Sequence, residues 1–238
     1  MNRALVKKKV RQEMRYTWIV CLMLLTGSVC PRFTLGQTPY HLLPGKADAD
    51  GCMPATAARI CLGTTGTEHC YAPPNSKENV FGLDPKATPV GRIDGNELTL
   101  FTATFSGCGS GTLTDFSLLT VRNGEFVNLL PAMQLTNQSE YKLWTLPRLS
   151  SLPIVVTADF IWDLEAMQKS NFAEETHFAA HRYAIFAYVF DKNSGHYLQK
   201  VHYLTTKKYP GLNDVDEVKV LGGERQAILA KLQQAPPG

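Results

Sequence analysis

The 238-residue sequence lacks the short motifs that mark several common enzyme chemistries. It contains no Cys-x-x-Cys pair, which thiol oxidoreductases use, and no Walker motif for binding nucleotide phosphates. Its glycine-rich stretch, residues 107–111, has Gly109 at the position where a nucleophile elbow requires serine. We therefore expect this stretch to be a tight loop between two strands, with Cys108 available for a disulfide bond.

Positive charge is also scarce once the N-terminal segment is set aside. The chain has 24 Lys and Arg residues against 21 Asp and Glu residues, but residues 1–36 hold seven of the bases and one of the acids. The rest of the chain therefore has 17 basic and 20 acidic residues, a net charge of −3. Nucleic-acid-binding domains are basic, so we expect no nucleic-acid partner.

The basic N-terminal segment has the three parts of a secretory signal. A basic stretch runs to Arg15, an apolar run of 13 residues follows at 18–30, and small residues precede Gln37. A helix of 13 residues spans about 20 Å, less than the roughly 30 Å hydrocarbon core of a bilayer. We therefore predict a signal peptide at residues 1–36 and an exported protein, periplasmic or secreted. The alternative is an uncleaved signal that anchors the protein, which would be its one contact with the membrane.

Export would allow disulfide bonds in the segment that follows the signal, residues 37–90. Glycine and proline interrupt this segment, residues 55–62 could form at most a helical turn or two, and its apolar periods are too few for it to fold alone. We expect disulfides to hold it against the next domain. Four cysteines are candidates, and they can pair in three ways: Cys52, Cys61, Cys70 and Cys108.

The remaining residues, 91–235, have the pattern of a β-rich domain. Asn123-Gly124 favours a two-residue type I′ turn, which would set Val121 opposite Phe126. Both faces of the hairpin strands are largely apolar, which predicts sheets covered on both sides. The predicted elements are strands at 97–105, 140–146 and 153–162, hairpins at 115–130 and 181–206, an insertion helix at 164–170 and a C-terminal helix at 223–234.

The order strand, interruption, hairpin occurs twice in this domain. Either an internal duplication or the general resemblance of β-meanders would explain the repeat. The predicted fold class is mainly β, or β-rich α+β, with antiparallel sheets from two hairpin-containing units. A two-layer sandwich and a pair of propeller-like blades both fit this pattern.

One cluster of side chains has the composition of a metal site. Glu174, Glu175, His177 and His181 are close in sequence, and the His-x-x-x-His spacing suits zinc. Phe178 stands where a zinc protease has its glutamate base, so that activity is not favoured. Structural histidines on a sheet are the other interpretation. We expect no cofactor, with zinc at this cluster as the alternative.

The second hairpin also has an aromatic stripe. Such a stripe belongs to the core when another layer covers it, and it forms a binding surface for a partner or a glycan when none does. Its members are Phe186, Tyr188, Phe190, Tyr197 and Tyr203.

The absence of a coherent catalytic set favours an exported non-enzymatic protein that binds a partner protein or an envelope polymer. One alternative is an exported hydrolase with a metal ion or an acid/base set drawn from residues 174–181 and Asp159. The other is a structural envelope protein stabilised by disulfides.

Overall fold

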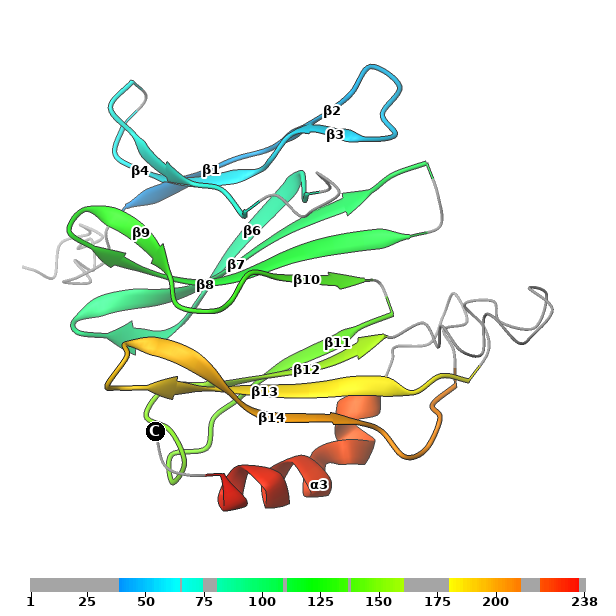
Figure 1. Cartoon of the computed structure of the whole chain (residues 1–238). Helices are drawn as coiled ribbons and strands as arrows, with labels where there is room; N and C mark the ends of the chain where they lie inside the picture. The colour runs from blue at the N-terminus through cyan, green and yellow to red at the C-terminus, as the bar shows by residue number, and fades with distance from the viewer. Residues whose placement is uncertain are drawn as a thin grey trace, which may run out of the picture. The chain divides into compact units, whose positions relative to one another are not determined.

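The computed structural model describes residues 39–64, 66–74, 81–108, 111–136, 138–160, 180–210 and 219–235 (Figure 1). The predicted signal peptide and the predicted insertion helix lie outside these residues. The prediction of a mainly β fold with antiparallel sheets is confirmed, and the described part of the chain has one helix. This helix is not long and apolar enough to cross a membrane.

The cysteine-containing segment forms strands of its own. The N-terminal sheet has the order β1-β4-β5 and consists of β1 (Tyr40–Leu43), β4 (Arg59–Leu62) and β5 (His69–Tyr71). A separate two-stranded ribbon consists of β2 (Lys46–Ala47) and β3 (Pro54–Thr56). The expected helical turn at residues 55–62 is therefore wrong, because this stretch runs from β3 into β4.

The next five strands make the middle sheet, which has the order β10-β8-β7-β6, with β9 also paired to β8. Its strands are β6 (Asp84–Ile93), β7 (Asn96–Ser106), β8 (Thr112–Arg122), β9 (Glu125–Asn128) and β10 (Met133–Thr136). β6 contains Pro85 and Pro89, yet it forms a strand because it lies at the edge of the sheet, where a missing N–H is tolerated.

The last four strands make the helix-covered sheet, in the order β11-β12-β13-β14. They are β11 (Glu140–Trp144), β12 (Ile154–Phe160), β13 (Tyr183–Asp191) and β14 (His196–Leu204), and α3 (Val220–Gln234) follows them. Helix α3 begins before the predicted residue 223, because the carboxylate of Glu140 accepts a hydrogen bond from the Leu221 N–H at 2.8 Å. A tertiary contact thus satisfies one of the free N–H groups of the first turn.

Two tight turns each contain an Asx-Gly pair, and the one at Asn123-Gly124 was predicted from the sequence. Asn123 and Gly124 have φ angles of 52° and 81°, as a type I′ turn requires, and Val121 pairs with Phe126 as expected. Asp94 and Gly95 have φ angles of 50° and 82° in the turn between β6 and β7. Asp, Asn and Gly residues tolerate this left-handed conformation, so the local sequence determines the register of both hairpins.

Three hydrophobic clusters cover both faces of the two larger sheets. One lies between the N-terminal sheet and the middle sheet, around Ile60 and Phe101. The second lies between the middle sheet and the helix-covered sheet, around Leu118 and Val155. The third lies between the helix-covered sheet and α3 and includes Ile228. The prediction of sheets covered on both faces is therefore confirmed.

One disulfide bond lies within the N-terminal sheet, and a second joins the β2–β3 ribbon to the end of β7. Cys61 and Cys70 are direct cross-strand partners on β4 and β5. Cys52, in the loop between β2 and β3, is bonded to Cys108 in the loop after β7. Two disulfides in one domain are typical of proteins from oxidising compartments.

Candidate functional site

The predicted metal cluster is only partly described. Three of its members lie outside the described residues: Glu174, Glu175 and His177. His181 lies just before β13, where its backbone bridges that of Tyr209. Its ring is largely buried and packs edge-on against Phe160, with the ring centroids 4.4 Å apart. Across the described ranges no three His, Cys, Asp or Glu side chains are grouped to hold a metal ion. Zinc binding therefore stays a prediction about the rest of the cluster.

Asp159, the other candidate for acid/base chemistry, does not converge with His181. Neighbouring residues of a strand point to opposite faces, and Phe160 packs on the α3 side of the helix-covered sheet, next to His181. Asp159 therefore faces the middle sheet, where its charge acts on Tyr188. His181 and Asp159 lie on different faces of the sheet.

Asp159 nevertheless has an unusual environment. Burial raises the pKa of its carboxyl group to about 6, and the neighbouring Thr157 hydroxyl offsets part of this rise. Among the described residues, that hydroxyl makes no hydrogen bond of acceptable geometry, and the buried Oδ1 atom of Asp159 finds no partner. A carboxyl group with this pKa changes between its protonated and its ionised form slightly below neutral pH.

The aromatic stripe of the second hairpin is divided between two faces of its sheet. Tyr188 and Tyr197 are 9% and 2% exposed and belong to the cluster between the two large sheets, with Phe186 and Phe190 packed against it. Tyr203 lies on the α3 side, opposite Ile185.

A β-bulge between Ala187 and Tyr188 accounts for this division of the stripe. An extra residue in one strand shifts the register by one, and such a shift moves each following side chain to the other face. His202 is consequently opposite Phe186, not Ile185, and its ring stacks on Phe186 with the centroids 4.6 Å apart.

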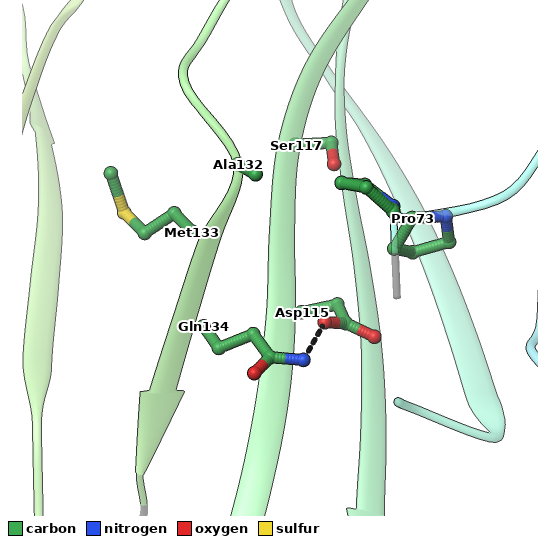
Figure 2. A pocket seen from close by; sticks show the side chains of 7 residues that line it. Pro73, Asp115, Ser117, Ala132, Met133 and Gln134 are labelled. Carbon is green, nitrogen blue, oxygen red and sulfur yellow. Dashed lines mark hydrogen bonds between the residues drawn. The ribbon is translucent and has the colours of Figure 1, made fainter. Parts of the chain in front are cut away.

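A small cavity of about 180 Å³ lies beside β8 and β10, lined in part by Pro73 and Met133 (Figure 2). Figure 2 shows Asp115 and Gln134 pointing toward one another across these strands, and the Gln134 amide donates a hydrogen bond to the carboxylate at 2.8 Å. Ser117, on the same face of β8, exchanges a 2.9 Å hydrogen bond with the Tyr71 hydroxyl.

Asp115 has a structural role in this cavity. Its Oδ2 accepts a hydrogen bond from the Gly82 N–H at 2.7 Å, and Gly82 lies so close to Ala103 that a Cβ there would clash with the Ala103 carbonyl. The carboxylate therefore holds the entry to β6 against β7. Burial raises its pKa, and its two hydrogen bonds oppose the rise.

A larger cavity, about 530 Å³, lies where three hairpin turns meet, and we name it the hairpin pocket. Its turns come from both large sheets: Asp94-Gly95 and Asn123-Gly124 in the middle sheet, and residues 192–195 in the helix-covered sheet. The volume is within the range of small-molecule sites. The lining residues are Arg92, Ile93, Asp94, Arg122, Ser151, Leu152, Phe190, Lys192, Asn193, Ser194 and Gly195.

Arg122 is held across the two sheets. It ends β8 in the middle sheet, and its Nη2 donates a 3.4 Å hydrogen bond to the Gly195 carbonyl of the other sheet. A Cβ at position 195 would lie 3.4 Å from Nη2 and 3.5 Å from Nη1, so the guanidinium lies directly against the glycine. Within the described ranges Arg122 has no ion-pair partner.

The three turns supply a basic residue each. A basic residue lies beside each of the three turns in the sequence: Arg92 before Asp94, Arg122 before Asn123, and Lys192 after Asp191. Their meeting in space depends on how the sheets stack, which the sequence pattern did not show.

Comparison of the chain with protein-family models, with curated proteins and with solved structures finds no match in any of the three. The described geometry is therefore the basis for the functional conclusion. Among the described residues, the hairpin pocket combines a volume of ligand size with converging polar groups.

Proposed function

We propose that the protein is an exported, non-enzymatic binding protein, and that it holds part of a partner protein or an envelope polymer in the hairpin pocket. The observation that carries this proposal is the meeting of three turns from two sheets around one cavity of about 530 Å³. Turns on a rigid β scaffold are common positions for binding residues, because they can vary without disturbing the core.

Architecture and compartment support the same proposal. The middle sheet and the helix-covered sheet share a core, which favours a sandwich arrangement over a pair of propeller-like blades. Two disulfides and the predicted signal peptide favour export.

Binding can be tested on protein recovered from the exported fraction of cells that express the full chain. Soluble oligosaccharides and peptides, both charged and neutral, are titrated by calorimetry, and mass spectrometry monitors their integrity. We expect saturable binding of at least one ligand, which stays intact.

Ser151→Trp provides the structural control for this titration. Ser151 is exposed and lines the pocket, so an indole there should fill the cavity and abolish binding without a change of charge. Gln233→Trp, at an exposed position of α3, should leave affinity unchanged. Cleavage of the ligand, or binding that survives Ser151→Trp, would contradict the proposal.

A further inference from the structure

The hairpin pocket combines positive charge with an apolar floor. Ile93 and Leu152 are buried, and Phe190 is partly buried at the same cavity. Arg92, Arg122 and Lys192 lie around this floor, whereas Asp94 is the acidic residue that lines it. The lining therefore has a charge of +2, although the chain after residue 36 is acidic overall.

The two carboxylates nearest to Arg122 and Lys192 in the chain do not pair with them. Asp191 is buried, and its Oδ2 accepts the Ser194 N–H at 2.7 Å, so that the group is bound into its own turn. Glu125 is opposite Arg122 in the ladder, but the two form no ion pair. Lys192 likewise has no ion-pair partner in the described part of the chain.

The donors of Arg122 suit an oxyanion in particular. A guanidinium carries five N–H donors in a planar fork that matches the two oxygens of a carboxylate or a phosphate. The Gly195 carbonyl uses one of them, and the contact with the glycine backbone orients the rest. An arginine held in this way loses little side-chain entropy when it binds a ligand.

We infer that the hairpin pocket binds a carboxylate or phosphate group of its ligand through Arg122 and Lys192, while the body of the ligand packs on Ile93, Leu152 and Phe190. This inference rests on the proposed function and adds the chemical class of the ligand. An acidic sugar and a phosphorylated molecule both supply the required group.

The test uses three probes on the exported full-length protein: inorganic phosphate, glucuronate and glucose. Calorimetry should show one-site binding of at least one anion, and no binding of glucose. Binding of phosphate alone identifies a phosphorylated ligand, and tighter binding of glucuronate identifies an acidic sugar. Rising salt should weaken binding, since it screens charges.

Charge variants should act in opposite directions. Arg122→Gln should weaken anion binding about tenfold or more, the usual effect of losing a charge-assisted hydrogen bond. Lys192→Gln should weaken it about threefold, because an exposed ammonium contributes less. Asp94→Asn should strengthen it about threefold. Asn is preferred at this position of a type I′ turn, so the fold is preserved.

Arg59→Gln is the matched control, since Arg59 is exposed on β4 and does not line the pocket. It should leave anion affinity unchanged. The inference is overturned if neither anion binds at millimolar concentration, if Arg59→Gln weakens binding as much as Lys192→Gln, or if Asp94→Asn has no effect.

Failure of this inference can be told apart from failure of the proposed function. If a neutral oligosaccharide or peptide binds the wild type and fails to bind the Ser151→Trp variant, the result would support the proposed function and contradict the anion site. Absence of binding by every charged and neutral ligand would overturn both.

Discussion

The middle sheet and the helix-covered sheet are both antiparallel meanders, but their outer faces are covered in different ways. The N-terminal sheet covers the first, over a cluster of five buried hydrophobic residues. One disulfide cross-links two of its strands, and another ties the adjoining β2–β3 ribbon to the loop after β7. Helix α3 covers the second, over a cluster of fourteen, with no covalent link. A small core contributes less burial energy, so the cover with the smaller core is the one that has disulfides.

Polar contacts strengthen the same contrast. Helix α3 is fixed by Glu224, which accepts hydrogen bonds from the hydroxyls of Tyr203 at 2.8 Å and Tyr209 at 2.5 Å. Arg225 lies over the ring of Trp144. On the other cover, Tyr71 makes one such bond, to Ser117. The outer face of the middle sheet is therefore covered by a segment with covalent links, and that of the helix-covered sheet by a helix held through packing and polar contacts.

The largest effect is expected from breaking the covalent cover. The Cys52–Cys108 bond spans 56 residues. Closing a loop of that length removes entropy from the unfolded chain and so raises its free energy by about 4 kcal/mol. The Cys52→Ala, Cys108→Ala double variant should therefore lose about that much unfolding free energy, measured by denaturant titration. The nine-residue span of Cys61–Cys70 predicts a smaller loss, about 3 kcal/mol, for its own double variant. Equal losses in the two would contradict this explanation.

The packing of α3 on its sheet should depend mainly on the buried hydrophobic side chains between them. Ile228 is fully buried between α3 and the sheet, and Ile228→Ala should cost about 3 kcal/mol, because it removes buried methyl groups and leaves a cavity. Gln226→Ala, exposed on the same helix, is the control and should change stability by less than about 0.5 kcal/mol. A loss with Gln226→Ala as large as that with Ile228→Ala would show that helix propensity, not packing, is being measured.

A buried carboxylate and a partly buried one sharpen the comparison through their effect on stability. Folding raises the pKa of Asp159 from 3.8 to about 6, so its cost to stability is absent near pH 4, grows as the pH rises through this window, and is complete above it. Asp159→Asn should match the wild type at about pH 4 and exceed it by about 2 to 3 kcal/mol at about pH 8.

Asp115 in the middle sheet differs from Asp159 because its carboxylate accepts hydrogen bonds from Gly82 and Gln134, which oppose the rise of its pKa. Asp115→Asn should lower stability at neutral pH by about 1 to 2 kcal/mol. Thermal denaturation across pH checks both variants. A stabilising Asp115→Asn, or an Asp159→Asn without pH dependence, would break the distinction between a paired and an unpaired carboxylate.

The smallest effect is expected for Glu224→Gln. The amide keeps one acceptor for two tyrosine hydroxyls, so the variant should lose about 1 kcal/mol. Chemical denaturation can resolve this loss against Glu125→Gln, an exposed substitution on β9 with the same change of charge. If Glu224→Gln loses no more unfolding free energy than Glu125→Gln, the hydrogen bonds to Glu224 do not stabilise the packing of α3.

Local chemistry made the turns and the first hairpin predictable. Asn123-Gly124 determines its own conformation, and the register that placed Val121 opposite Phe126 follows from it. The two-sided apolar pattern of the strands likewise predicted sheets with cores on both faces. These features depend on residues that are close in the chain.

Features that depend on distant residues could not be predicted. Nothing near Ala187 in the sequence indicates a bulge, so Tyr203 was expected on the same face as the rest of the aromatic stripe. Pro85 and Pro89 argued against a strand, because their place at a sheet edge is a property of the whole sheet. The hairpin pocket required the two sheets to be stacked before its basic residues could meet.

The connectivity of the disulfides has a consequence for the order of events during synthesis. Cys61 and Cys70 emerge within nine residues of each other and can pair as soon as their hairpin closes. Cys52 emerges first of the four bonded cysteines, but it has no native partner until Cys108 follows, 56 residues later. During that interval the nearest thiol is Cys61, so early closure of the small hairpin protects Cys52 from mispairing. Thiol–disulfide exchange must otherwise correct the error.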